Sequence, residues 1–433
     1  MAALMADGLT VAESAASADL VVVNTCAFIE AAREESIDVV LGLSAARKSG
    51  AKVVATGCMA ERYGNELAAA LPEVDAVIGF AGAGSIAQAV GMLPASFQPI
   101  NQLDQPVTMR RKPVGVRDLL ELPRPKSQTP WAYLKVAEGC DRACAFCAIP
   151  TFRGKQRSRS TDSVVNEARG LVADGVREIV LVAQDLAWYG RDIDAPGALT
   201  PLLVDLDQLR SEGLERIRLL YLYPSEVRDP LVSTMLELPS VVPYFDLSLQ
   251  HASRPLLARM KRWGSGAQFL DSIAAIRAAQ PDAVFRSSFI CGFPGETESM
   301  HSEMLSFLDA AQLDWAGFFS YSQEDGTTAV ALDGAVDADV IRERLGELHA
   351  VQEPITAASR QALLGTVQAV LVDGLDEDDH WIGRTFRESP EIDGVVRLEP
   401  DPSLHAGVVL AARITGCEGP DLFGEVAANV GVK

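Results

Sequence analysis

Three of the chain's seven cysteines, Cys140, Cys144 and Cys147, lie within eight residues in the pattern C-x3-C-x2-C. This spacing differs from the paired knuckles of the usual zinc sites. The nearest histidine, His251, is over a hundred residues away. Thiolates are soft ligands that select iron–sulfur clusters and zinc. Three thiolates can hold three corners of an iron–sulfur cube and leave one iron open, so the pattern predicts a cluster that performs chemistry.

Two further cysteines follow predicted strands in the first part of the chain. Cys26 ends the apolar segment 19–26, and Cys58 ends the apolar segment 51–58. Ligands of open α/β sheets bind at the carboxyl ends of the strands, so both are candidate ligands. Cys291 and Cys417 lie in apolar surroundings, and we predict that they are small core residues.

The elements around these cysteines alternate between strand and helix patterns. In residues 1–92, predicted strands at 19–26, 51–58 and 74–80 are separated by helical segments, which indicates a parallel sheet covered by helices. Seven prolines between 93 and 130 predict a linker. Six further strands predict a full or partial parallel barrel; they span 131–137, 177–184, 216–222, 243–250, 284–293 and 314–322. The cysteine triad directly follows the first of these, at the edge where such barrels place their active sites.

The last hundred residues change character. One long helix is predicted over 335–363, bent near Pro354. Short strands with Gly, Asp and Pro turns then predict a small β-barrel over 366–433. This segment has 13 acidic and 5 basic residues, a net charge of −8.

Charge and hydropathy limit the partners and the compartment. The net charge of −21 disfavours a protein that holds nucleic acid by bulk electrostatics, and it favours a basic partner or plain solubility. We find no signal peptide and no apolar run long enough to cross a bilayer, so we expect a cytoplasmic protein without a membrane partner. In that reducing compartment, clustered cysteines are more often metal ligands than disulfides.

Several motifs in the same order resemble one family. The segments "EGCDRACAFCAIPTFRGKQRSRS", "YLYPSE", "FDLSLQHAS", "GFPGETE", "YSQEDGT" and "GRTFRESPEIDGVV" are similar to those of the radical S-adenosylmethionine methylthiotransferases. The resemblance implies an α/β chain with a flavodoxin-like methylthiotransferase domain at 1–92 and a linker at 93–130. A radical (β/α) barrel with its trailing helix would follow at 131–363, and a small TRAM β-barrel at 366–433.

The resemblance also implies a cofactor and its ligands. Cys140, Cys144 and Cys147 would hold a [4Fe–4S] cluster, whose open iron binds S-adenosylmethionine and cleaves it to a 5′-deoxyadenosyl radical. Phe146 would pack near the adenine. The further cofactor contacts that we expect at strand ends are Gln184, Asp185, Gly292 and Glu296.

The family's first domain uses three cysteines to hold a second, auxiliary [4Fe–4S] cluster that delivers sulfur. Cys26 and Cys58 supply two of these ligands, and the first cysteine is absent. We therefore expect this domain to be truncated at its start, without its first strand and that strand's cysteine-bearing loop. The alternative is a protein that has lost the auxiliary cluster.

Within the family, the motifs most resemble a branch whose members modify a ribosomal protein, and this resemblance implies the substrate. Members of this branch methylthiolate the β-carbon of an aspartate on the twelfth small-subunit ribosomal protein. The implied partners are this basic protein or the 30S subunit, and an electron donor such as a flavodoxin or ferredoxin. One alternative is a transfer RNA adenosine methylthiotransferase of the MiaB type, but a barrel that grips RNA should be basic rather than acidic. An alternative from another class is a non-catalytic iron–sulfur or RNA-binding adaptor.

Other residues near these motifs have two interpretations. Arg153, Lys155, Arg157 and Arg159 form either a solvated basic loop or contacts to substrate or cofactor. For Trp188 and Tyr189 we favour core packing over a place at the substrate mouth. For His251 we favour a structural hydrogen bond over catalysis.

Overall fold

A computed structural model describes residues 4–5, 8–80, 82, 86, 90–91, 120, 124 and 126–427. The chain forms two compact units, which we describe separately. The first contains Met1–Pro125, Phe146–Lys155 and Ser322–Val330, and the second contains Lys126–Ala145, Gln156–Tyr321 and Ala331–Lys433. Most of the predicted linker at 93–130 lies outside the described residues.

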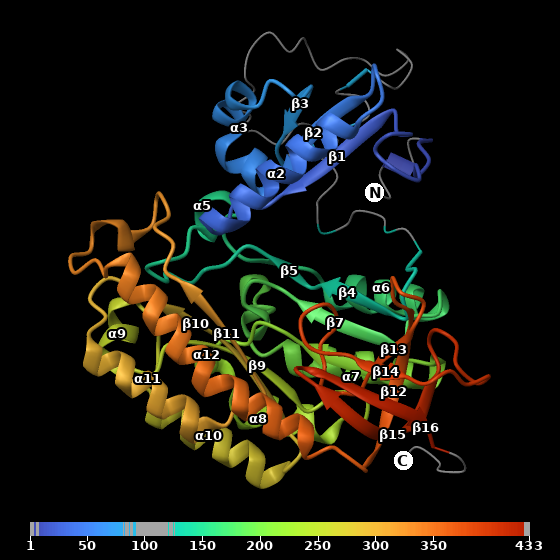
Figure 1. The fold of residues 1–433 in the computed structure, drawn as a ribbon, viewed down its shortest axis with the longest axis vertical. Helices are drawn as coiled ribbons and strands as arrows, with labels where there is room; N and C mark the ends of the chain where they lie inside the picture. Colours follow the sequence, from blue (N-terminus) through green and yellow to red (C-terminus); the bar gives the residue numbers. More distant parts are fainter. Residues whose placement is uncertain are drawn as a thin grey trace. The chain divides into compact units, whose positions relative to one another are not determined.

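The first unit is built on a parallel sheet with two crossover helices (Figure 1). The strands β1 (Leu20–Thr25), β2 (Lys52–Gly57) and β3 (Ala76–Ile78) pair in this order. The helices α2 (Glu30–Ala46) and α3 (Cys58–Ala70) connect them. Val21, Val23 and Val53 are buried in a core with residues of both helices. The strand–helix alternation predicted for this region is confirmed, because β-branched side chains suit strands that helices cover.

The second unit contains the predicted barrel strands, all parallel within their sheets. The first sheet has the order β4 (Trp131–Lys135), β7 (Glu178–Val182) and β8 (Arg216–Leu219). The second has the order β9 (Tyr244–Gln250), β10 (Val284–Cys291) and β11 (Trp315–Ser320). Single bridges from Ile217 to Val241 and from Leu222 to Leu247 join the two sheets. Among the described residues β4 and β11 do not pair, so the barrel is partial.

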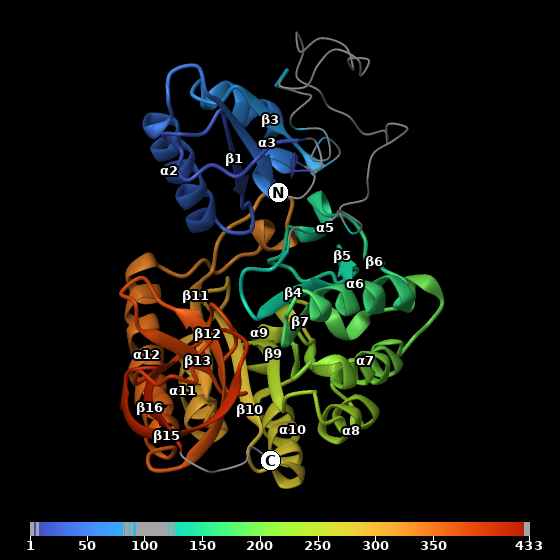
Figure 2. The ribbon, with the colours of Figure 1, turned by 90° about the vertical axis from the view of Figure 1, so that its right-hand side faces the viewer.

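Helices follow most of these strands and lie outside them (Figure 2). They are α6 (Thr161–Ala173), α7 (Leu199–Asp207), α8 (Asp229–Glu237), α9 (Arg254–Arg259), α10 (Gly266–Ala279) and α11 (Glu298–Ala311). Two features were not predicted. The hairpin strands β5 (Ala137–Glu138) and β6 (Arg157–Ser158) flank the cysteine loop, and the short helix α5 (Ile149–Phe152) follows Cys147.

The C-terminal part of the second unit is the predicted helix and small barrel. Helix α12 (Ala338–Gln361) contains Pro354 and is assigned as a single helix. It leads into a closed five-stranded barrel with the order β12-β13-β14-β16-β15. The strands are β12 (Val367–Leu375), β13 (Trp381–Arg384), β14 (Val396–Leu398), β15 (Val409–Glu418) and β16 (Asp421–Val426).

A buried ion cluster joins this small barrel to the first sheet of the partial barrel. Glu178, at the start of β7, is fully buried and lies 2.7 Å from both Arg218 Nε and Arg384 Nη1. Arg384 also pairs with Asp373 at 2.6 Å. Burial raises the pKa of Glu178, but Arg384, Arg218 and Arg216 outweigh it and lower the pKa to about 2. The carboxylate therefore stays charged, and the two barrels share one electrostatic core.

Candidate active site

The loop after β5 carries the first two cysteines of the triad. Cys140 is buried, and its Sγ accepts a hydrogen bond from the backbone N–H of Arg142 at 3.4 Å. Cys144 is half-buried, and Arg262 Nη1 donates to its Sγ at 3.5 Å. The backbone N–H of Ala145 donates to the carbonyl of Met260 at 2.9 Å. The segment after α9 thus holds the cysteine loop in place through both a backbone and a side-chain contact.

The Cys140 thiol lies in surroundings that resist ionisation. Burial raises its pKa to about 11, with a further contribution from the Asp185 and Cys144 charges, although the Arg142 backbone N–H acts in the opposite direction. Coordination to a metal deprotonates a thiol outright. Cys140 therefore becomes a thiolate most readily when a metal centre supplies the positive charge.

Cys147 and the neighbouring Phe146 are half-buried at the start of the turn into α5. Within the described part of the chain, no three His, Cys, Asp or Glu side chains converge tightly enough to hold a single metal ion. A four-iron cluster does not need such convergence, because each thiolate binds a different corner of the cube. The donor set here is three sulfurs without a histidine, which suits iron–sulfur chemistry.

Beside Cys144, arginine and aromatic side chains alternate in what we call the arginine ladder: Arg262, Tyr223, Arg142, Trp188 and Arg191. The guanidinium carbons of Arg262 and Arg142 lie 3.9 and 3.8 Å from the centre of the Tyr223 ring. Those of Arg142 and Arg191 lie 4.1 and 3.8 Å from the centre of the Trp188 ring. Such cation–π contacts fix planar groups against one another.

Two carboxylates accept hydrogen bonds from arginines of the ladder. Asp185 Oδ2 accepts a hydrogen bond from Arg142 Nε at 2.7 Å. Glu226, in a short 3-10 turn after β8, accepts from Arg142 Nη2 at 3.1 Å and from Arg191 Nη2 at 2.6 Å. Burial raises the pKa of Glu226, but hydrogen bonds from Arg142 and Ser225 outweigh it and the pKa falls. Glu226 therefore remains a carboxylate that bridges two arginines.

Two of the predicted cofactor contacts have buried oxygen atoms that lack a partner. Asp185 is 3% exposed, and its Oδ1 has no hydrogen-bond partner among the described residues. The same is true of Gln184 Oε1. Burial raises the pKa of Asp185 more than Arg142 lowers it. Unpaired buried acceptors are costly, so these atoms mark a place where a ligand with N–H donors fits. The ammonium group of S-adenosylmethionine is such a donor.

The other two predicted contacts are engaged within the protein. Gly292 has φ of +81°, and a Cβ there would lie 2.4 Å from the Ile341 side chain. Its backbone N–H donates to Glu296 Oε2, while Glu296 Oε1 lies 3.3 Å from Arg344 Nη1 of α12. Burial raises the pKa of Glu296 despite these contacts. A cofactor contact by Gly292 and Glu296 stays a prediction.

In the first unit, Cys26 and Cys58 directly follow the ends of two neighbouring strands. Thr25 of β1 is paired with Gly57 of β2, so the next residue of each strand is a cysteine at the same sheet edge. Gly57 has φ of +96°, and a Cβ there would lie 2.3 Å from Asn24 Oδ1, so this turn requires glycine. Arg153 Nη2 donates a hydrogen bond to Cys58 Sγ at 2.7 Å.

The structure decides several of the open interpretations. His251 is buried and accepts a hydrogen bond from the Ser253 backbone N–H at 2.9 Å, so the structural role is confirmed. Tyr189 is a buried core residue, as predicted, and its hydroxyl donates a hydrogen bond to the Arg159 carbonyl at 2.8 Å. For Trp188 the core interpretation is wrong, because its half-buried ring lies between two arginines of the ladder. Arg159 is buried and pairs with Glu167 at 2.5 Å, so it is structural.

The arginine ladder itself was missed. Arginines and aromatic residues occur throughout this sequence, and the alternation arises from four separate segments that only the fold brings together. The sequence did contain one signal for this site. Trp188, Tyr223 and Arg262 each lie a few residues after a predicted strand or after the helix that follows it.

Comparison with known proteins finds three matching family profiles and solved structures of similar fold. The profile described as Radical SAM superfamily matches residues 134–308, Uncharacterized protein family UPF0004 matches 1–79, and TRAM domain matches 364–427. The solved structure of the radical S-adenosylmethionine methyltransferase TsrM from Kitasatospora setae is similar with a TM-score of 0.49 and 14% identity, covering 81% of this chain and 68% of that chain.

Relatives in sequence span nearly the whole chain. The ribosomal protein uS12 methylthiotransferase RimO of Cutibacterium acnes is 42% identical, covering 98% of this chain and 94% of the relative. The protein of the same name from Saccharopolyspora erythraea is 41% identical, covering 96% and 89%. The chain therefore belongs to the RimO family of radical S-adenosylmethionine methylthiotransferases.

Proposed function

We propose that this enzyme methylthiolates the β-carbon of an aspartate on ribosomal protein uS12. The proposal rests on the C-x3-C-x2-C triad, together with the buried oxygens of Asp185 and Gln184 that have no hydrogen-bond partner among the described residues. The names of the relatives supply the substrate. A ribosomal protein as substrate would place the reaction in the cytoplasm.

The chain's own residues would hold and orient the cofactors. A [4Fe–4S] cluster with bound S-adenosylmethionine supplies one-electron chemistry that can break an unactivated C–H bond. Cys140, Cys144 and Cys147 would each bind one iron. Asp185 Oδ1 would accept a hydrogen bond from the cofactor's ammonium group, while Arg142 holds the other oxygen of Asp185 at 2.7 Å. The electron would come from a small donor protein such as a flavodoxin or ferredoxin.

A second cluster in the first unit would provide the sulfur, and we assign Cys26 and Cys58 to it. Their support is the shared sheet edge and the hydrogen bond from Arg153 to Cys58. Iron and sulfide analysis of the reconstituted chain tests this assignment. About eight irons, falling to about four in a Cys26→Ala, Cys58→Ala variant, is the expected result. About four irons in both proteins would contradict it.

The last barrel favours a protein substrate over transfer RNA. Three of its four described arginines, Arg384, Arg387 and Arg397, pair with the carboxylates of Asp373, Asp282 and Asp376 at 2.6, 3.0 and 2.6 Å. The fourth, Arg413, donates to the Gly365 carbonyl at 2.9 Å. Arginines that carboxylates already neutralise form no surface for phosphates, which dominate the affinity of RNA-binding proteins.

Separate incubations with each candidate substrate test the proposal. The reconstituted, reduced chain is incubated with S-adenosylmethionine and either uS12, the 30S subunit or transfer RNA. We expect one methylthio group on an aspartate of uS12, located by mass spectrometry of its peptides, and unmodified adenosines in the RNA. Methylthiolated adenosine with unmodified uS12 would reverse the assignment. No 5′-deoxyadenosine with any substrate would support a non-catalytic adaptor.

A further inference from the structure

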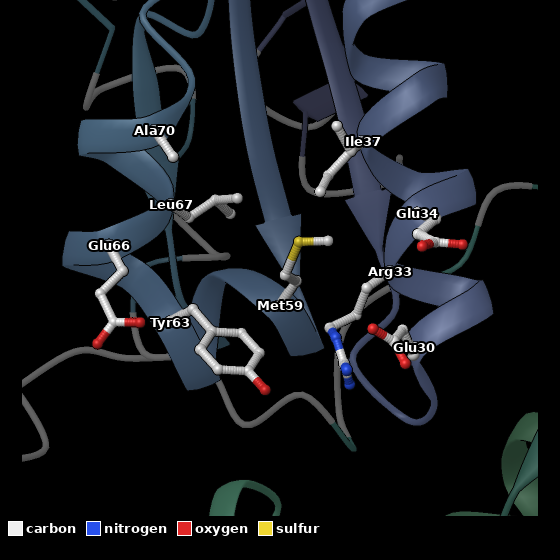
Figure 3. Close-up of a pocket in the computed structure, with 9 residues that line it drawn as sticks. All are labelled: Glu30, Arg33, Glu34, Ile37, Met59, Tyr63, Glu66, Leu67 and Ala70. Carbon is white, nitrogen blue, oxygen red and sulfur yellow. The ribbon is translucent and has the colours of Figure 1, made fainter. Parts of the chain in front are cut away.

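A groove of about 400 Å³ runs between α2 and α3 of the first unit. Figure 3 shows residues of both helices facing it, with the Met59 thioether between them. The residues that line it are Glu30, Arg33, Glu34, Ile37, Met59, Tyr63, Glu66, Leu67 and Ala70. The proposed chemistry uses none of these side chains.

The floor of the groove is apolar and reaches the core of the unit. Met59 and Leu67 are 2% and 6% exposed, and half-buried Ile37 packs against the same core. Methionine is unbranched and polarizable, so a floor with Met59 can adapt to a side chain that enters. The groove can therefore accept an apolar anchor from a partner.

The rim of the groove is acidic and its charges are not neutralised. Glu30 and Glu34 on α2 and Glu66 on α3 are exposed, and the described residues offer them no ion pair. Arg33, the one cation of the lining, is already paired, because its Nη1 lies 2.5 Å from Glu324 Oε2. The groove thus presents negative charge around an apolar floor.

We propose that this groove docks a basic, amphipathic segment of the ribosomal-protein substrate, an inference that rests on the proposed function. Ribosomal proteins neutralise RNA phosphates, so they carry lysine and arginine that complement the three rim glutamates. The same rim repels RNA. It also disfavours a second copy of this chain, whose net charge is −21.

A matched pair of charge-reversal variants tests the groove. The groove variant is Glu34→Lys with Glu66→Lys. The control is Glu13→Lys with Glu35→Lys, which makes the same charge change at exposed positions outside the lining. Binding of fluorescently labelled uS12 to the full reconstituted chain is measured by anisotropy at low salt. We expect the Kd to rise about tenfold in the groove variant and less than about twofold in the control.

Thermal unfolding and turnover complete the test. Both variants should melt like the wild type, and the groove variant should show a raised KM for uS12 with an unchanged kcat. Equal Kd values for the two variants, with wild-type turnover intact, would overturn the groove and leave the proposed function standing. If binding depends on the groove but uS12 is not methylthiolated, the groove proposal would stand and the proposed function would be overturned. Self-association of the wild type that the groove variant abolishes would make a second copy the occupant and overturn the proposal.

Discussion

At the residue scale, the site contains side chains that are fixed by some of their polar atoms while other polar atoms have no hydrogen-bond partner among the described residues. Asp185 uses one carboxylate oxygen to hold Arg142 and keeps the other buried and unpaired. The Tyr223 ring and Arg262 continue this arrangement to the Cys144 sulfur. A donor that binds there would offset the cost of burying the unpaired oxygen.

Replacing Asp185 tests this account of the cofactor contact. In Asp185→Asn the charge is lost while the size is kept, and a hydrogen bond to a charged group is typically worth about 1.5–3 kcal/mol. We expect the Kd for S-adenosylmethionine to rise about tenfold or more, with the absorption spectrum of the cluster unchanged. Asp194→Asn, at an exposed position with positive φ, is the control. Equal affinities in the two variants would remove Asp185 from the cofactor site.

His251 should make stability depend on pH. Burial, followed by the charges of His301 and Arg344, lowers its pKa from 6.5 to about 3. The folded state therefore keeps this ring neutral, whereas the unfolded state takes up a proton below about pH 6.5. The stabilisation is complete above that pH and is lost as the pH falls toward 3.

Urea unfolding at several pH values measures this effect. The midpoint for the wild type should fall between about pH 7 and pH 5.5. In His251→Asn, which keeps an acceptor for the Ser253 N–H, the fall should be smaller. Parallel curves for the two proteins would show that another group causes the acid sensitivity.

At the element scale, the strands and the cysteines could be predicted together, and the arginine ladder could not. The strands β7, β9 and β10 are rich in β-branched, aromatic and other apolar residues, most of them buried, so they can be predicted from a single sequence. The paired strands β5 and β6 have two residues each, which is too short for any pattern. The opening between β4 and β11 depends on long-range pairing that local sequence does not encode.

The ion cluster around Glu178 is the element-scale feature most open to a stability test. In Glu178→Gln the buried guanidinium groups of Arg218 and Arg384 lose their shared carboxylate. Breaking one partner of a buried pair typically costs about 3–5 kcal/mol. We expect a clear fall in the denaturation midpoint of the second unit, and none in the exposed control Glu215→Gln. A midpoint unchanged by Glu178→Gln would mean that other contacts hold the two barrels together.

At the scale of the whole molecule, the chain matches RimO proteins over nearly its full length. We propose that its net charge of −21 suits the basic substrate. No helix of the described chain has the length and apolar character of a membrane span. The three-domain architecture could be predicted from the sequence, because the motifs occur in the same order as in the family. The pairing of the arginines in the last barrel, which argues against an RNA surface, required the folded structure.

Radical cleavage of S-adenosylmethionine should depend on the cysteine triad. The most direct measurement is the 5′-deoxyadenosine released by the reduced, reconstituted chain and by a variant with alanine at Cys140, Cys144 and Cys147. Cys417→Ala, outside the triad, is the control. We expect the wild type and the control to release 5′-deoxyadenosine and the triad variant to release none. Equal release by the triad variant, or none by the wild type, would contradict this expectation.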